Sequence, residues 1–170
     1  LDETLLNMQR FLPLHIKLTH GQGVGADSVL CAEMMLMRGD DNQAEILCHK
    51  ALYQARSKHE FCICLCAEQV LARVAILRGD VEGFFTALQN IKSYAKESSN
   101  HYILRMIDIC LSVISVALDI TDMVAKWFCD IESINKKVYA RAVPYVTILY
   151  SHLLVREKRH AEYLGLVDDA

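Results

Sequence analysis

A histidine and two cysteines near the middle of the chain have the spacing of metal ligands on a helix. His59, Cys62 and Cys66 follow one another at steps of three and four residues, which would place them on one face of an α-helix. Imidazole and thiolate groups are common zinc ligands. One short helix face rarely encloses a metal, however, and no second ligand pair stands nearby in the sequence. We therefore expect no metal site and no cofactor, and interpret these side chains as structural.

Three glycines at positions 21, 23 and 25 resemble a phosphate-binding loop. A dinucleotide-binding loop needs a strand before its glycines and an acidic residue about twenty positions later, and a P-loop needs a lysine after its last glycine. No apolar strand precedes His20, and no lysine follows Gly25. The segment is better interpreted as a flexible entry to a helix that begins near Ala26.

Catalysis is not expected. No serine, cysteine or histidine stands in a recognisable activating context, and the carboxylates are scattered along helix faces, where solvated charge is the ordinary interpretation. An enzyme with an all-helical pocket remains an alternative.

Composition limits the other function classes. A net charge of −3 argues against direct nucleic-acid binding, which normally needs a clearly positive surface. The longest nearly apolar run, residues 109–118, has 10 residues, about half of the roughly 20 that a membrane-spanning helix requires. Seven cysteines lie almost entirely within apolar segments, where free cysteine behaves as a small hydrophobic residue. We expect a cytoplasmic protein with no membrane association, and the abrupt ends suggest a piece of a longer chain.

The chain repeats itself at a spacing of 40 residues. Residues 31–40 and 71–80 are both apolar segments that end in the same triplet, Arg38-Gly39-Asp40 and Arg78-Gly79-Asp80. A cell-adhesion signal is one interpretation of Arg-Gly-Asp, but its recurrence at a helix break each time favours a structural role. Arginine suits the end of a helix, glycine adopts the left-handed conformation that terminates it, and aspartate caps the next helix. We therefore predict hinges at Gly39, Asp40, Gly79 and Asp80.

These hinges predict an all-α fold of antiparallel helix pairs, a tetratricopeptide-like superhelix. Residues 61–66 and 113–116 alone would also fit buried strands, but each lies in a longer apolar stretch without glycine or proline, which favours helix. Small residues at positions 32, 44, 51, 72 and 75 would let helices approach closely. We predict one repeat domain over residues 1–170, with units at about 26–57, 60–97, 101–130 and 140–168. The third would pair a helix at 101–118 with a short one containing Trp127 and Phe128, and a loop at 132–137 would follow. Pro144 would lie in the first turn of the next helix.

Binding residues are expected on the concave side of such an array, which the first helix of each pair lines. Counting back from the hinge glycines places Glu33, Gln69 and Arg73 near this side. The corresponding stretch of the third unit offers Tyr102, Arg105 and Asp108. Polar groups with an aromatic ring in a groove suit a small polar ligand or a peptide. An ordinary solvated helix face is the alternative for each residue.

Three longer stretches carry a family resemblance. The first runs from His20-Gly21 through Ala32-Glu33, Gly39-Asp40 and Ala44-Glu45 to residues 50–55, the second is residues 71–80, and the third joins Tyr150 and Leu153-Leu154 to residues 163–166. Their order resembles the long helical region of ATP-dependent, LuxR-type bacterial transcriptional regulators of the maltose-regulon-activator group. The third unit departs from the pattern, with residues 118–121 where Arg-Gly-Asp would stand.

The resemblance implies a function. In such regulators this tetratricopeptide-like region lies between a nucleotide-binding module and a DNA-reading helix-turn-helix, and it receives a small-molecule inducer or a regulatory protein that biases self-assembly. The chain would then be a sensor domain, with ATP and DNA binding in flanking segments and self-association left open. The alternative is a stand-alone tetratricopeptide-type scaffold that binds a peptide or protein partner.

Overall fold

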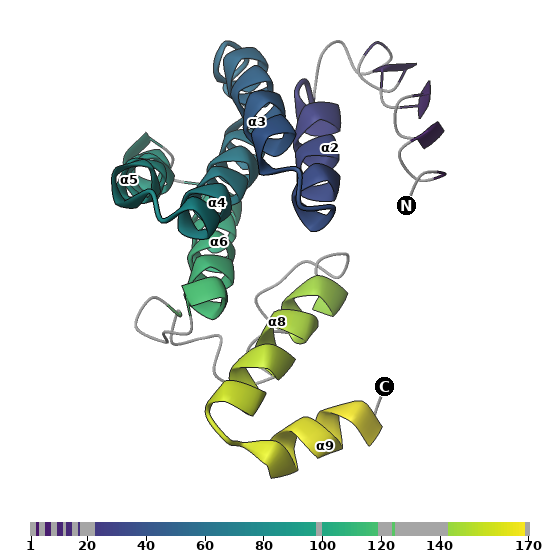
Figure 1. Ribbon diagram of the computed structural model, residues 1–170, viewed down its shortest axis with the longest axis vertical. Helices are drawn as coiled ribbons and strands as arrows, with labels where there is room; N and C mark the ends of the chain where they lie inside the picture. Colours follow the sequence, from purple (N-terminus) through teal and green to yellow (C-terminus); the bar gives the residue numbers. More distant parts are fainter. Residues whose placement is uncertain are drawn as a thin grey trace. The chain divides into compact units, whose positions relative to one another are not determined.

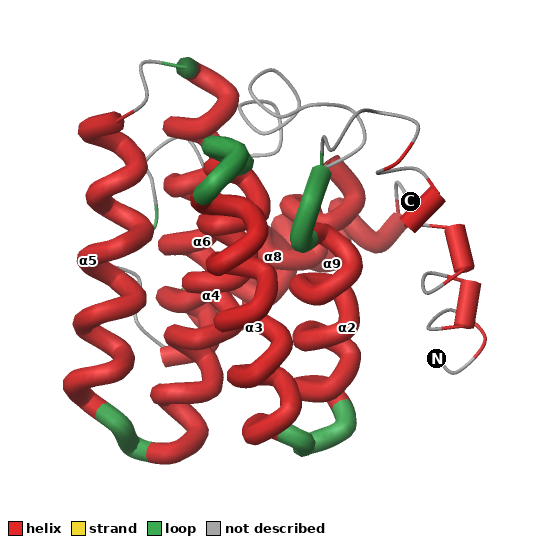
Figure 2. The backbone as a smooth tube through the Cα atoms, turned by 90° about the horizontal axis from the view of Figure 1, so that it is seen from above, coloured by secondary structure: helices red, strands yellow, loops and turns green. Residues whose placement is uncertain are grey.

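The computed structural model describes residues 23–97, 100–118 and 143–168, together with residue 124 and scattered positions before residue 18. Every regular element of these described residues is an α-helix, and they contain no strand (Figures 1 and 2). The prediction of an all-α fold is confirmed, and both apolar runs that alone fit a strand lie within helices. The chain divides into two compact units, residues 1–103 and 104–170. A single repeat domain over residues 1–170 stays a prediction.

Four helices form two hairpins in the first unit. Helix α2 (Ala26–Met37) pairs with α3 (Asp41–Arg56), and α4 (Phe61–Arg78) pairs with α5 (Val81–Glu97). Helix α4 also packs against α3 and α2, and Figure 2, in which these helices run up the picture, shows them side by side. Helix α4 therefore contacts each of the other three.

Both hairpins turn at an Arg-Gly-Asp triplet through the same set of hydrogen bonds. Gly39 and Gly79 adopt left-handed φ angles of +81° and +68°, a conformation that costs glycine little. The corresponding bonds are Asp40 N–H to Met35 O and Asp80 N–H to Ala75 O, each 2.9 Å, and Gln43 N–H to Asp40 Oδ1 and Gly83 N–H to Asp80 Oδ1, each 3.0 Å. Each aspartate thus closes one helix through its backbone and caps the next through its side chain.

Two further corners use the same backbone pattern without glycine. His59, between α3 and α4, has φ +55°, and Lys158, in the second unit, has φ +59°. The residue after each donates its N–H to the carbonyl five positions earlier, Glu60 to Ala55 at 3.1 Å and Arg159 to Leu154 at 2.8 Å. His59 therefore lies in a turn before α4, so the prediction that it shares a helix face with Cys62 and Cys66 is wrong.

Small residues form much of the first unit's core. The alanines at positions 32, 44, 51, 55, 67 and 72 are fully buried. Side chains of this size let helix axes approach closely, since few atoms stand between the backbones. Larger residues, among them Leu65, Val70 and Ile91, fill the remaining space and are also fully buried.

The second unit contains α6 (His101–Leu118) from residue 104 onward, α8 (Val143–Arg156) and α9 (His160–Asp168). Ile109 and Val113 of α6 pack into one apolar cluster with Val146, Leu149, Tyr150, Leu153 and Leu154 of α8. Pro144 is the second residue of α8, where its missing N–H costs nothing. The predicted short helix with Trp127 and Phe128, and the loop at 132–137, lie outside the described residues.

None of the helices within the described residues combines the length and apolar character needed to cross a bilayer.

Candidate functional site

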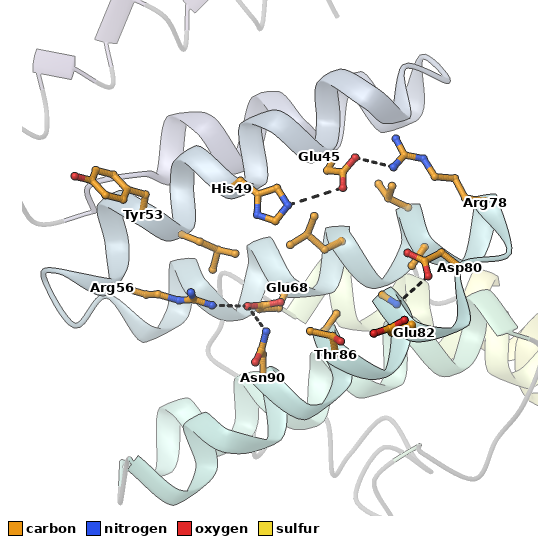
Figure 3. A pocket seen from close by; sticks show the side chains of 16 residues that line it. Glu45, His49, Tyr53, Arg56, Glu68, Arg78, Asp80, Glu82, Thr86 and Asn90 are labelled. Atoms are coloured by element: carbon orange, nitrogen blue, oxygen red, sulfur yellow. Dashed lines mark hydrogen bonds and ion pairs between the residues drawn. The ribbon is translucent and has the colours of Figure 1, made fainter.

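A groove opens between α3 and α5, with α4 as its floor (Figure 3). Its volume is about 700 Å³, within the range of small-molecule sites. Each helix contributes side chains spaced three or four positions apart, the spacing that defines one helix face. Helix α3 contributes Glu45, His49, Tyr53 and Arg56 to the lining, and α4 contributes Glu68, Leu71, Val74, Ala75 and Arg78. Helix α5 and the corner before it contribute Asp80, Glu82, Thr86, Ala87 and Asn90. We call this site the α3–α5 groove.

A buried carboxylate lies on the groove floor. Glu68 is only 1% exposed, and its Oε1 accepts hydrogen bonds from Arg56 Nη2 and Asn90 Nδ2, each 3.0 Å long. These bonds join α4 to α3 on one side and to α5 on the other, as Figure 3 shows. Burial raises the pKa of Glu68 above its ordinary value, and the bonds from Asn90 and Arg56 partly oppose that rise. Glu68 therefore connects all three walls of the groove.

Within the described residues, Glu68 Oε2 accepts no hydrogen bond, since both bonds to this side chain end on Oε1. Oε2 is not among the buried side-chain atoms that lack a partner in the described residues, so this oxygen keeps contact with solvent and can accept a hydrogen bond from a ligand. Because Glu68 lines the groove, a ligand bound there could supply this hydrogen-bond donor.

Arg78 ties the opposite end of α4 to α3. Its guanidinium donates to Asp41 Oδ2, to Glu45 Oε2 at 2.6 Å and to Asn42 Oδ1 at 2.8 Å. The hydrogen bond from Arg78 lowers the pKa of Asp41 below its ordinary value. Arg78 lines the groove, but its positive charge is directed to the carboxylates of α3.

Two carboxylates at the start of α5 have no such cationic partner. Asp80 Oδ1 accepts the Gly83 N–H as a helix cap, and Glu82 is exposed in the first turn. No basic side chain among the described residues pairs with either of them. The positive end of the helix dipole favours anionic side chains at this position.

The residues predicted for the concave side occupy another face, between α2 and α4. Arg73 Nη1 donates to both carboxylate oxygens of Glu33 at 2.8 Å, so these two are brought together as a pair. Gln69 is only 5% exposed, and its Nε2 has no hydrogen-bond partner in the described part of the chain. None of the three lines the α3–α5 groove, and their role in ligand binding stays a prediction.

The other predicted residues lie along α6. Tyr102 donates its backbone N–H to Asn100 Oδ1 at 2.9 Å, and a side-chain hydrogen bond links it to Cys62. Arg105 Nη1 lies 3.5 Å from Asp108 Oδ2, one helical turn away. The boundary between the two units falls between Tyr102 and these two residues.

The cysteines of the described residues are free thiols. Cys48, Cys64 and Cys110 are buried, as expected for cysteine acting as a small hydrophobic residue. Burial raises the pKa of Cys48 to about 12. No three metal-ligating side chains gather anywhere in the described residues, and His59 lies outside the helix that carries Cys62 and Cys66.

Sequence reasoning missed the groove, although a signal for Glu68 existed. Glu68 is the one acidic residue in the apolar stretch from 61 to 72, and a charge in such a stretch predicts either a partner or a function. Its partners Arg56 and Asn90 stand 12 and 22 positions away, so the sequence alone does not identify them.

These features define a class of protein: an all-helical chain whose first unit is built from packed hairpins and holds a mixed polar and apolar groove. No family model, curated protein or solved structure matches the chain. The chemistry of the groove is therefore the basis for a functional proposal.

Proposed function

We propose that this chain is a ligand-binding helical domain and that the α3–α5 groove is its binding site. The observation that carries the proposal is a space of about 700 Å³ lined by three helices, with the buried carboxylate of Glu68 on its floor. A site with apolar walls and a few convergent polar groups is the usual form of a ligand pocket.

Binding explains this arrangement better than catalysis. Both guanidinium groups of the groove, on Arg56 and Arg78, are held in ion pairs with carboxylates. We therefore propose no reaction for the groove.

In the cell, we propose that the domain is the sensor region of a LuxR-type transcriptional regulator, on the resemblance of residues 20–55, 71–80 and 150–166 to that family. Ligand binding would then shift an equilibrium between assembly states, which requires different affinities for the two states. A stand-alone scaffold that binds a peptide is the second candidate, because the groove is open along its length and the exposed ring of Tyr53 lies at its edge. A P-loop before this segment and a helix-turn-helix after it would favour the regulator.

Thermal-shift screening with sugars, amino acids and short peptides tests the binding function. A ligand present at 100 times its Kd stabilises the native state by about 2.7 kcal/mol, a readily measured rise in Tm. Thr86→Trp would fill the groove and should abolish the rise. Gln89→Trp places the same bulk on an exposed position of α5 outside the groove and should leave it unchanged. A ligand that stabilises the Thr86→Trp variant as much as the unmodified chain would show that the groove is not the site.

A further inference from the structure

Carboxylates outnumber guanidinium groups in the lining of the α3–α5 groove, and some of the carboxylates have no cationic partner. Four carboxylates line it, from Glu45, Glu68, Asp80 and Glu82, against the two guanidinium groups of Arg56 and Arg78. Both guanidinium groups already bind carboxylates, on Glu68 and on Asp41 and Glu45. The negative charge left without a cationic partner is therefore concentrated at the start of α5.

The unpaired acceptors stand at two separate places along the groove. Glu82 and Asn90 lie eight residues apart on α5, which at the rise of an α-helix is about 12 Å. Asn90 Nδ2 is bonded to Glu68 Oε1, so Asn90 marks the position of the Glu68 carboxylate. Figure 3 shows Asp80 and Glu82 toward one end of the groove, with Glu68 farther along it.

The lining between these two places is mostly apolar. It comes from Leu71, Val74 and Ala75 of α4 and from Ala87 of α5. A methylene chain laid along such a surface is removed from water, which favours its binding there. The groove thus offers, in order, an anionic end, an apolar middle and a buried hydrogen-bond acceptor.

We propose that the α3–α5 groove binds a free linear aliphatic amine that carries a hydrogen-bond donor at its far end. The ammonium group pairs with Asp80 and Glu82, the chain lies over Leu71, Val74 and Ala75, and the far donor bonds Glu68 Oε2. This assignment rests on the proposed binding function and names the chemistry of its ligand. Diamines and amino alcohols of about five carbons satisfy it, because their length plus one hydrogen bond at each end is close to the 12 Å separation.

The geometry disfavours other occupants of the groove. An anion would meet carboxylates at both places. A divalent cation needs several oxygen ligands at one point, and nowhere in the described residues do three metal-ligating side chains gather. A lysine side chain entering from the α5 end would bring its polypeptide backbone to Glu68, which is only 1% exposed. A slender free amine meets none of these obstacles.

Isothermal titration with four five-carbon probes tests the assignment: 1,5-diaminopentane, 5-amino-1-pentanol, 1-aminopentane and 5-aminopentanoate. The first two should bind at least fivefold more tightly than 1-aminopentane, because only they donate to Glu68. The anionic end of 5-aminopentanoate should make it the weakest, since it meets an acceptor. Four probes indistinguishable in affinity would overturn the assignment.

Variants of single carboxylates locate the ammonium group. Glu82→Gln should weaken binding of the diamine about two- to fivefold, the range expected when one exposed ion pair is lost. Glu97→Gln makes the same charge change on the same helix outside the groove and should have little effect. An equal loss in both variants would mean that diffuse charge attracts the amine, and the assignment would be wrong.

Glu68→Gln should reverse the preference of the groove at its far end from a donor to an acceptor. A glutamine that keeps its oxygen toward Arg56 and Asn90 presents an N–H group to the groove, so 5-aminopentanoate should gain affinity relative to the diamine. Should this variant fail to fold, the Glu82→Gln comparison still decides.

Two outcomes separate the ligand class from the binding function. If the amines do not bind but a screened sugar or amino acid stabilises the unmodified chain and not Thr86→Trp, the amine assignment is wrong and the binding function stands. A lysine-containing peptide that binds more than tenfold tighter than the diamine would assign the groove to a protein partner and overturn the choice of a free amine.

Discussion

A carboxylate at the centre of three packed helices must exchange its hydration for bonds from the protein. Glu68 does so through Arg56 and Asn90, but the exchange is incomplete, because Arg56 is itself 55% exposed and one carboxylate oxygen accepts neither bond. The raised pKa of Glu68 reflects this incomplete compensation. Glu68 is thus a charge that the fold tolerates rather than one that stabilises it.

The raised pKa of Glu68 gives stability a specific pH dependence. The folded chain holds this proton more tightly than the unfolded chain, in which the pKa is near 4.5. Linkage then requires the contribution of Glu68 to be fully present below about pH 4.5 and to be lost as pH rises through the raised pKa. Glu68→Gln cannot lose the proton, so the stability of the unmodified chain relative to the variant should fall as pH rises.

Urea unfolding of both proteins between pH 4 and pH 8 measures this difference. Both proteins retain the ionisable side chains that interact with Glu68, among them Arg56, Tyr94, Cys48 and Cys64, so the difference between the curves reports the loss of the Glu68 carboxyl together with its coupling to these groups. Parallel stability curves over this range would show that the pKa of Glu68 is not raised.

The cysteines give a second prediction at this scale. Cys48 is fully buried and its pKa is raised to about 12, so very little of it is thiolate at pH 8. We expect iodoacetamide to modify Cys48 only when the chain unfolds, and to modify the partly exposed Cys31 much sooner. Mass spectrometry of peptides after timed labelling, with and without guanidinium, measures both rates. Labelling of Cys48 at the rate of Cys31 in buffer would contradict the burial of Cys48.

At the scale of helices, many helix boundaries could be predicted, because the residues that end one helix and begin the next are neighbours in the sequence. The triplets Arg38-Gly39-Asp40 and Arg78-Gly79-Asp80 contain the helix end, the left-handed residue and the next cap within three positions. The helices on either side therefore begin and end where the sequence predicts. His59 and Lys158 adopt the same conformation without glycine, so no glycine marks the left-handed residue of these two corners in the sequence.

Gly79→Val tests the corner between α4 and α5. A Cβ at Gly79 would meet no atom within 4 Å, so any cost comes from the left-handed backbone itself, roughly 1–2 kcal/mol and toward the upper end for a β-branched residue. Gly79→Asn is the matched control, because asparagine tolerates this conformation, and it should cost less. Chemical denaturation measures both variants, and equal midpoints for the Gly79→Val variant and the unmodified chain would mean that the corner relaxes out of the left-handed conformation.

At the scale of the whole molecule, residues 1–103 and 104–170 are separate compact units. In the first, α2 to α5 pack against one another, and the buried alanines, Leu65 and Ile91 of its core lie within residues 26–97. A fragment of residues 20–103 should therefore stay helical and unfold cooperatively.

Circular dichroism of that fragment during heating is the measurement. Its transition should lie within a few degrees of one seen in the full chain, since the removed residues 104–170 form the other compact unit. A fragment with little helix at 20 °C would show that the first unit depends on the rest of the chain.

The candidate site was less predictable than the fold because its residues come from helices that are distant in the sequence. Helix positions follow from residues three to five apart, whereas the α3–α5 groove exists only because α3 and α5 flank α4 with a gap between them. Glu33 and Arg73 looked like exposed binding groups in the sequence. The structure pairs them across 40 positions, and such a pairing is not evident from either residue alone.

The position of α4 has a mechanical consequence. A molecule that enters the groove and displaces α3 from α5 would also displace α2, because α2 and α3 pack together as one hairpin. Occupancy of the groove would then be transmitted to the outer surface of α2, which the ligand never touches.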